Sequence, residues 1–354
     1  MQDSGAVQGQ VDSFRKRRNL LGVLSLSAAM PWLPAIAAQP GSTPMRERLV
    51  LAGPPASVSN PLIHMVESGA LSDVAGKVEF VPWSNPDQLR ALAMGGEADF
   101  IAAPTNVAAN LYNRGVPLTL LNVSVWGILW MVSRNAHCRT LADFKDQEIA
   151  LPFRADMPDI LFTFLAEQQG LDVRKDFRLR YTASPMDAVQ LLAMRQVDHA
   201  LLAEPAVSMV LRKTRSFPMS LVAPDLYRSV NLQEEWGRLL SREPRIPQAG
   251  MAALGSVRHD QALLARFQQA YRQSATWCAG NAQECGKIVA GRFDMLTPDA
   301  VADSLGNVPL YYATAEQARP ELEHFFQLLL QRQPATVGGK LPDAAFYSPS
   351  PEQA

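Results

Sequence analysis

Residues that build metal and redox centres are scarce in this sequence. Among its 354 residues there are three cysteines and five histidines. The cysteines form no CxxC pair, and the histidines have none of the short spacings typical of zinc ligands. The sequence therefore predicts neither a metal site nor a bound cofactor.

A surplus of charge of either sign is also missing. The chain has 33 Lys and Arg against 34 Asp and Glu, a formal net charge of −1. Beyond residue 20 the basic residues are scattered and form no stripe with aromatic side chains. These features argue against a nucleic-acid partner.

Past the N-terminus, no apolar run is long enough for a transmembrane helix, which needs about 20 residues. The nearest approach, residues 116–132, is broken by Pro117, Asn122 and Gly127. Hydrophobic residues still make up 47% of the chain, enough for substantial cores. With roughly 100–200 residues per domain, the length predicts two domains.

The first 37 residues have the features of an export signal. A basic segment precedes a short apolar one, residues 20–29, and Ala35-Ile36-Ala37 fits a small-x-small cleavage site. We therefore expect a signal peptide over residues 1–37 and an exported, periplasmic protein that begins at Ala38 or Gln39.

The export route is indicated by a pair of arginines. Arg17 and Arg18, followed by Asn-Leu-Leu, resemble the twin-arginine signature, with Leu where Phe is usual. The alternative is that the mature protein keeps this segment as a basic, apolar arm.

Two stretches about 100 residues apart follow the same strand–helix–strand pattern. They are residues 80–104 and 180–205, and in each a proline opens the helix. Leu-Ala-Met recurs in both helices, and an aspartate, Asp99 or Asp198, precedes the second strand. Two copies are too few for a solenoid, so the repeat predicts two similar α/β lobes.

Strands alternate with helices in both lobes, which predicts mostly parallel sheets flanked by helices. We assign residues 46–127 and 257–335 to lobe one and residues 128–256 to lobe two, with two crossovers near 124–132 and 248–256. Residues 336–354 are rich in Pro, Gly and Ser, so a loose C-terminal tail is expected. The expected strands are 48–52, 78–81, 98–102, 118–123, 148–152, 177–181 and 200–203, a short one at 219–222, and 250–254 leading out of lobe two.

Four motifs occur in a characteristic order along the chain. The first is the export-type N-terminus, followed by a strand, a loop of small residues and a helix. The second is Gly95-Gly96-Glu97-Ala98-Asp99, and the third is the segment LADFKDQEIA at 141–150. The fourth motif runs from Gln196-Val197-Asp198 to Ala203-Glu204-Pro205. The last two are similar to the patterns LxDLKGKxIA and GxVDAxxxxEP of solute-binding proteins of ABC importers, although Arg195-Gln196 stands where that family usually has Gly.

The chain thus resembles these binding proteins over residues 46–335, most closely the group for nitrate, sulfonate, taurine and thiamine precursors. The resemblance implies a two-lobed periplasmic-binding-protein type II fold. It also implies that a small solute is captured between the lobes and delivered to a membrane permease and its ATPase. A monomer is expected.

In open α/β sheets, ligands bind beyond the carboxyl ends of the strands, where helix N-termini suit anions. We expect ligand contacts from Pro55, Ala56, Ser57, Trp83, Ser84, Thr105, Asn106, Trp126, Arg154, Asp156, Ser184 and Glu204. The serines of this set are also placed to cap helices, and its tryptophans to pack in a core or hinge. Arg154 and Asp156 could pair on a solvated rim, and Glu204 could either support the crossover or accept a ligand amine.

Two cysteines are placed for a disulfide in an oxidising compartment. Cys278 and Cys285 flank Gly280-Asn281, a predicted helix break. The alternative is two buried thiols. Cys138 has no partner in this scheme and is expected to be buried.

The leading hypothesis for function is a binding protein without catalytic chemistry. Its solute is expected to be small and anionic, similar to a sulfonate or nitrate, with pyrimidine or thiamine precursors as the alternative. An enzyme on a related fold is the first rival, but His64 has no visible partner for proton transfer. The second rival, a ligand-sensing domain of a transcription regulator, needs a helix-turn-helix module where the export signal stands.

Overall fold

A computed structural model describes residues 45–217, 225–309 and 311–349. The predicted export signal lies outside these residues, as do the predicted short strand at 219–222 and the end of the tail. Residues 43–354 form one compact unit. The described strands within it form two five-stranded sheets and one two-stranded sheet.

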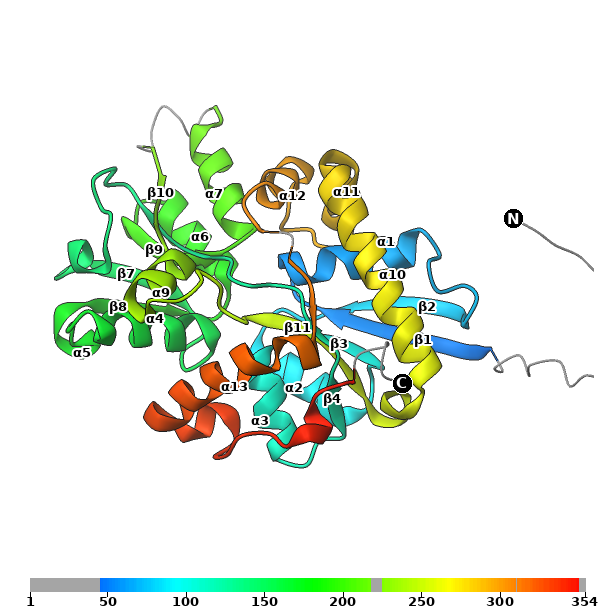
Figure 1. Cartoon of the computed structure of the whole chain (residues 1–354). Helices are drawn as coiled ribbons and strands as arrows, with labels where there is room; N and C mark the ends of the chain where they lie inside the picture. Colours follow the sequence, from blue (N-terminus) through cyan, green and yellow to red (C-terminus); the bar gives the residue numbers. More distant parts are fainter. Residues whose placement is uncertain (1–44, 218–224, 310, 350–354) are drawn as a thin grey trace, which may run out of the picture. The chain divides into compact units, whose positions relative to one another are not determined.

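The first five-stranded sheet is the centre of lobe one (Figure 1). Three parallel strands lie in the order β2-β1-β3, and β11 then pairs antiparallel with both β3 and β4. Four of the five strands therefore run in one direction. The strands are β1 (Arg46–Gly53), β2 (Ala75–Pro82), β3 (Phe100–Pro104), β4 (Leu118–Leu120) and β11 (Ala249–Leu254).

The second sheet repeats this plan in lobe two. Its order is β10-β6-β9-β7-β8, with β9, β7 and β8 parallel and β6 antiparallel to β9 and β10. The strands are β6 (Leu129–Ser133), β7 (Glu148–Pro152), β8 (Arg178–Thr182), β9 (His199–Ala203) and β10 (Tyr227–Asn231). In each sheet the antiparallel strand, β11 or β6, is the one that follows a crossover between the lobes. The predicted mostly parallel sheets are confirmed.

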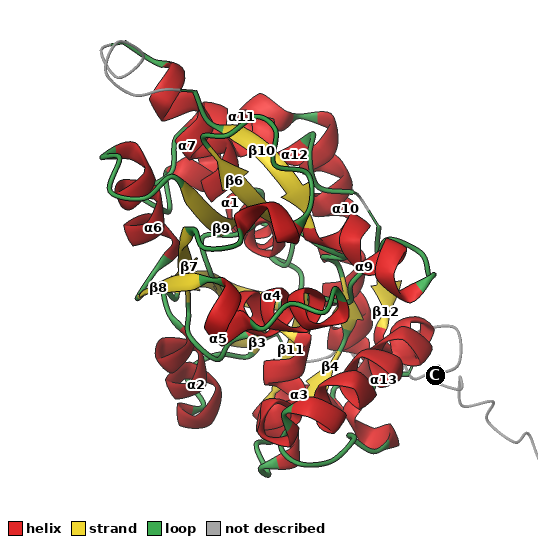
Figure 2. Ribbon diagram, turned by 90° about the vertical axis from the view of Figure 1, so that its left-hand side faces the viewer, coloured by secondary structure: helices red, strands yellow, loops and turns green. Residues whose placement is uncertain are grey.

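Helices lie on both sides of the strands (Figure 2). Lobe one contains α1 (Asn60–Glu67), α2 (Pro86–Gly95), α3 (Thr105–Asn113), α10 (Gln261–Gly280), α11 (Ala282–Ala290), α12 (Pro298–Leu305) and α13 (Ala315–Arg332). Lobe two contains α4 (Met157–Gln168), α5 (Val173–Asp176), α6 (Pro185–Ala193), α7 (Ala206–Arg215) and α9 (Leu232–Leu240). The short strands β5 (Asn122–Val123) and β12 (Ala313–Thr314) pair beside the first crossover. No helix in the described part of the chain is long and apolar enough to cross a membrane.

The alternation of β1 explains why helices cover both faces of its sheet. Leu49 and Leu51 belong to one buried cluster, with residues of α1 and α10. Val50 and Ala52 belong to another, with residues of α2, α3 and α13. Because successive strand residues point to opposite faces, the continuous buried run over residues 49–53 of β1 requires a cover on each side.

The repeat seen in the sequence corresponds to β2-α2-β3 in lobe one and β8-α6-β9 in lobe two. Asn85 caps α2 by accepting from two backbone N–H groups of its first turn. Ser184 caps α6 in a capping box with Asp187. A proline begins each helix, where its missing N–H has no helical partner to lose.

The two crossovers between the lobes are joined by backbone hydrogen bonds. The carbonyl of Val125 accepts from the N–H groups of Gln248 (3.0 Å) and Ala249 (3.2 Å). Gly127 has φ of +123°, and a Cβ there would lie 2.1 Å from the Oε1 of Gln233. Only glycine fits this position in the first crossover, because of both its backbone angle and its close neighbour.

Two expectations about the lobes were wrong. The strand at 249–254 was assigned to lobe two, but it pairs with β3 and β4 in the sheet of lobe one. Its six residues are all buried, and such an apolar run fits the interior of either sheet. The tail was expected to be loose, yet Val337 and Phe346 are fully buried against lobe one.

Candidate functional site

A cavity of about 120 Å³ lies between the lobes, where the strands of both sheets end. Lobe one contributes the loops after β1 and β2 and the end of β3, and lobe two contributes the loops after β7 and β8 and the end of β9. Both crossovers complete the wall. This is the position at which open α/β sheets bind ligands.

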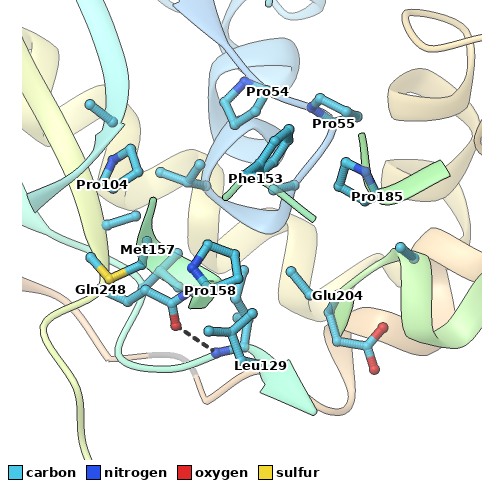
Figure 3. A pocket seen from close by; sticks show the side chains of 18 of the residues that line it. Pro54, Pro55, Pro104, Leu129, Phe153, Met157, Pro158, Pro185, Glu204 and Gln248 are labelled. Carbon is cyan, nitrogen blue, oxygen red and sulfur yellow. Dashed lines mark hydrogen bonds between the residues drawn. The ribbon is translucent and has the colours of Figure 1, made fainter. Parts of the chain in front are cut away.

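The wall of the cavity is largely apolar. Five prolines line it, together with aromatic and aliphatic side chains (Figure 3). Proline has no backbone N–H, so each of these positions offers the cavity carbon atoms and no donor. The five are Pro54, Pro55, Pro104, Pro158 and Pro185.

The loop after β7 turns an aromatic ring toward the cavity and a cation away from it. Phe153 and Ala155 both have φ of +62°, a left-handed angle that non-glycine residues rarely adopt. Phe153 lines the cavity, and Figure 3 shows its ring among Pro54, Pro55 and Pro185. Arg154, between the two strained residues, is exposed, lines a separate groove, and lies 5.3 Å over the ring of Tyr181. Such strain is typical of functional loops.

Glu204 is the ionisable side chain among the described residues that line the cavity, and it is fully buried. Its Oε1 accepts from Nε (3.1 Å) and Nη2 (2.6 Å) of Arg228, and its Oε2 accepts from the N–H of Ser208 at 3.0 Å. Its carboxylate points away from the prolines (Figure 3). The charge of Glu204 is thus compensated within lobe two.

Gln248, just before β11, connects the cavity to the hinge. Its Oε1 accepts from the N–H of Ile128 in the first crossover at 3.1 Å. Its side chain is 6% exposed, and its Nε2 has no hydrogen-bond partner among the described residues. The cavity therefore contains an amide donor that the fold leaves unused.

Of the twelve residues predicted to contact a ligand, five line the cavity: Pro55, Ala56, Trp83, Ser84 and Glu204. Ser57 follows them in the chain, and its buried Oγ has no hydrogen-bond partner in the described structure. Ser84 is at the exposed end of the loop after β2. Trp83 is 5% exposed.

Three more of the predicted residues support lobe one or the hinge, and none of them lines the cavity. Thr105 donates its Oγ1–H to the carbonyl of Pro247 at 2.5 Å, which ties α3 to the second crossover. Asn106 is buried and donates to the carbonyl of Thr336 at 3.5 Å. Trp126 is 3% exposed, donates to the carbonyl of Val123, and packs edge-on against Tyr311.

The last three lie in lobe two outside the cavity lining. Arg154 faces the outer groove, and Ser184 caps α6. Asp156 does not pair with Arg154; its Oδ2 accepts from Nη2 of Arg90, on α2 of lobe one, at 3.0 Å. The expected rim pair is therefore replaced by an ion pair between the lobes.

Several lining residues were missed by sequence reasoning: Pro54, Val58, Ala103, Pro104, Val125, Ile128, Leu129, Met157, Pro158, Pro185, Ala203, Ala206, Gln248 and Ala249. One signal could have found some of them, because prolines occur in the segments that follow predicted strands in both lobes. No local signal singled out Phe153 over Arg154, since the direction of each side chain depends on the left-handed turn.

Cys278 and Cys285 lie on α10 and α11, outside the lining of the cavity. Cys278 and Cys285 are both buried and are free thiols in the structure, so the expected disulfide is not formed there. The side chain of Cys285, together with burial, raises the pKa of the Cys278 thiol. Cys138 is buried, as expected.

No protein-family model and no curated protein sequence matches the chain. Its structure is similar to that of an ABC transporter protein from Parabacteroides distasonis, with a TM-score of 0.68 and 23% identity over 85% of this chain and 98% of that one. It is also similar to the alkanesulfonate-binding protein SsuA from Xanthomonas axonopodis pv. citri, with a TM-score of 0.59 and 17% identity over 86% and 97%. A third similar structure is that of the nitrate-binding protein NrtA from Synechocystis PCC 6803, with a TM-score of 0.63 and 13% identity over 82% of this chain and 84% of that one. The chain therefore has the two-lobed α/β fold of ABC-transporter substrate-binding proteins.

Proposed function

We propose that this protein is the substrate-binding component of an ABC import system. The observation that carries the proposal is the cavity between the lobes, whose wall comes from both lobes and both crossovers. A site divided in this way is filled when a hinge closes, and a binding protein uses that closure to capture its solute. The similar structures include sulfonate- and nitrate-binding proteins.

A binding role fits the chemistry of the cavity better than catalysis does. General acid–base catalysis needs a titratable group within reach of the ligand. Glu204 is occupied by Arg228 and Ser208. His64, the sequence's candidate, stacks on Trp277 at 4.0 Å between ring centroids and has its Nδ1 2.9 Å from the Oγ of Ser274.

The partners of such a protein are a membrane permease and its ATPase, and its place of action is the periplasm. The export signal predicted over residues 1–37 supports this location. N-terminal sequencing of periplasmic protein should begin at Ala38 or Gln39. Replacing Arg17 and Arg18 by Lys should block export if the twin-arginine route is used, and intact Met1 in the cytoplasm would contradict export.

The sequence-based expectation for the ligand was a sulfonate- or nitrate-like anion. Several helices begin at the cavity, including α4, α6 and α7, and their N-termini favour negative charge. However, Pro158 and Pro185 occupy the first turns of α4 and α6, and neither donates an N–H. Nitrate, which has no apolar part, is therefore a poor match for this wall of prolines and aliphatic side chains.

The proposed function is tested by the ligand that the protein retains. Native mass spectrometry after gentle purification should find a small solute bound one to one. Adding that solute should change the fluorescence of Trp83 in the cavity wall and Trp126 in the first crossover saturably. A product that differs from the added solute would instead indicate an enzyme.

A further inference from the structure

The cavity between the lobes contains a specific combination of groups that narrows the class of ligand. Its lining residues include no Lys or Arg within the described chain, and its acid is already paired with Arg228. A desolvated anion without a cation is costly, whereas an apolar group gains from leaving water. The wall therefore disfavours a charged ligand of either sign.

A side-chain donor that the fold leaves unused identifies one polar contact that the cavity can make. Gln248 is more than nine-tenths buried, and its Nε2 has no partner among the described residues, while its Oε1 is held by Ile128. An amide donor that the fold leaves without a partner is available to a hydrogen-bond acceptor on a ligand. The amide orientation is fixed, because the N–H of Ile128 requires the oxygen on its side.

The cavity also limits the size of the ligand. It holds about 120 Å³. An apolar cavity of about 150 Å³ accommodates benzene in another protein. The site thus has room for a group close to one six-membered ring, packed against Phe153 and the prolines.

We propose that the cavity binds a small uncharged ligand with an apolar body of about one ring and a single hydrogen-bond acceptor, which accepts from the Nε2 of Gln248. This inference rests on the proposed binding function and specifies its ligand. It replaces the anion that the sequence led us to expect. It also assigns Gln248 two contacts, one to the ligand and one to the hinge.

The test compares probes of similar size that differ in charge. Cyclohexanone carries a carbonyl acceptor on an apolar ring, and cyclopentanecarboxylate and butanesulfonate are matched anions. Calorimetry on the full mature protein at pH 8 should show cyclohexanone binding at least about tenfold more tightly than either anion, since one desolvated unpaired charge exceeds 1.4 kcal/mol. Tighter binding of an anion would overturn the ligand class but leave the binding function standing.

Variants of Gln248 test the assigned contact. Gln248→Glu keeps the oxygen that accepts from Ile128 but replaces the donor by a second acceptor, which repels a ligand carbonyl. It should therefore weaken cyclohexanone binding by at least about tenfold, more than the loss of one neutral hydrogen bond. Binding of methylcyclopentane, which has no acceptor, should change less than that of cyclohexanone. Gln248→Met removes both the contact to the ligand and the contact to the hinge. The thermal midpoint of this variant without ligand measures the loss of the hinge bond, which is thereby separated from the loss of the donor.

Three further outcomes each support or contradict the proposal. An unchanged affinity of Gln248→Glu for cyclohexanone would refute the role of Nε2. An uncharged retained ligand of one-ring size, identified by mass spectrometry, would support the proposal directly. If neither probe class binds and no ligand is retained, the proposed function and this inference fail together.

Discussion

Arg90 on α2 of lobe one donates to Asp156, at the start of α4 in lobe two, at 3.0 Å. This ion pair joins the lobes beside the cavity. Asp156 is 7% exposed, whereas the side chain of Arg90 is 38% exposed. The pair is therefore half-sheltered, and it belongs to the closed arrangement of the lobes.

Removing the cation should weaken closure. Arg90→Ala leaves the carboxylate of Asp156 buried without its partner, which opposes the closed state. Because Arg90 is partly exposed, we expect about 1 kcal/mol, a loss of about threefold to tenfold in ligand affinity. Calorimetry with the retained ligand measures this loss of affinity.

The control for this prediction is the double variant with Asp156→Asn, in which no charge is stranded. It should recover part of the affinity lost in Arg90→Ala alone. Equal losses in the single and double variants would show that the ion pair does not contribute to closure.

Asp156 should also make ligand affinity depend on pH. Burial raises the pKa of its carboxyl, Arg90 opposes this rise, and Asp87 and Asp159 add to it. When the lobes open, water returns and the pKa falls toward its ordinary value of 3.8. The contribution of Asp156 to closure is therefore fully present below pH 3.8, the pKa of the open state. It is lost as the pH rises through the raised pKa of the closed state. Affinity for an uncharged ligand should be higher in acid, and a pH-independent Asp156→Asn variant is the matching control.

Phe153 and Arg154 should respond to substitution in opposite ways. Phe153→Ala removes an aromatic wall of the cavity and should weaken binding by at least about tenfold, since burying such a ring is worth roughly 1.5–3 kcal/mol. Arg154→Ala should change affinity less than about twofold, because Arg154 lies in the outer groove over Tyr181. A large loss in Arg154→Ala would restore the anion site predicted from the sequence.

Glu204 should matter for stability of lobe two. Glu204→Ala leaves Arg228 and the N–H of Ser208 without their buried acceptor, and breaking such a pair costs about 3–5 kcal/mol. Glu204→Gln keeps an acceptor for one of the two and should cost less. Chemical denaturation measures both variants, and a Glu204→Ala protein as stable as the parent would contradict this account.

Cys278 and Cys285 should form a disulfide when the protein matures in an oxidising compartment. Both thiols are buried, and the side chain of Cys285 contributes to the raised pKa of Cys278. Protein isolated from the periplasm should be two hydrogens lighter than the reduced form. Under non-reducing, denaturing conditions only Cys138 should be alkylated, and alkylation of all three cysteines would refute the pair.

Local sequence patterns were enough for the elements and the fold. A proline after a capping residue marks the starts of α2 and α6, and the recurring Leu-Ala-Met triplet revealed that the lobes share a plan. These signals depend on backbone geometry within a few residues, which is why they survive without tertiary information. The two-lobed fold predicted from them is confirmed.

The details of the site depended on contacts between distant segments. The strand at 249–254 is apolar throughout, and only its pairing with β3 and β4 placed it in lobe one. Phe153 and Arg154 are neighbours, yet the left-handed angle at Phe153 sends one to the cavity and the other to the outer groove. Asp156 pairs with Arg90, which lies 66 residues away in the sequence and on the other lobe. The sequence determined where strands, helices and cavity loops would be, whereas the polarity of the cavity was decided by side-chain directions that only the folded chain fixes.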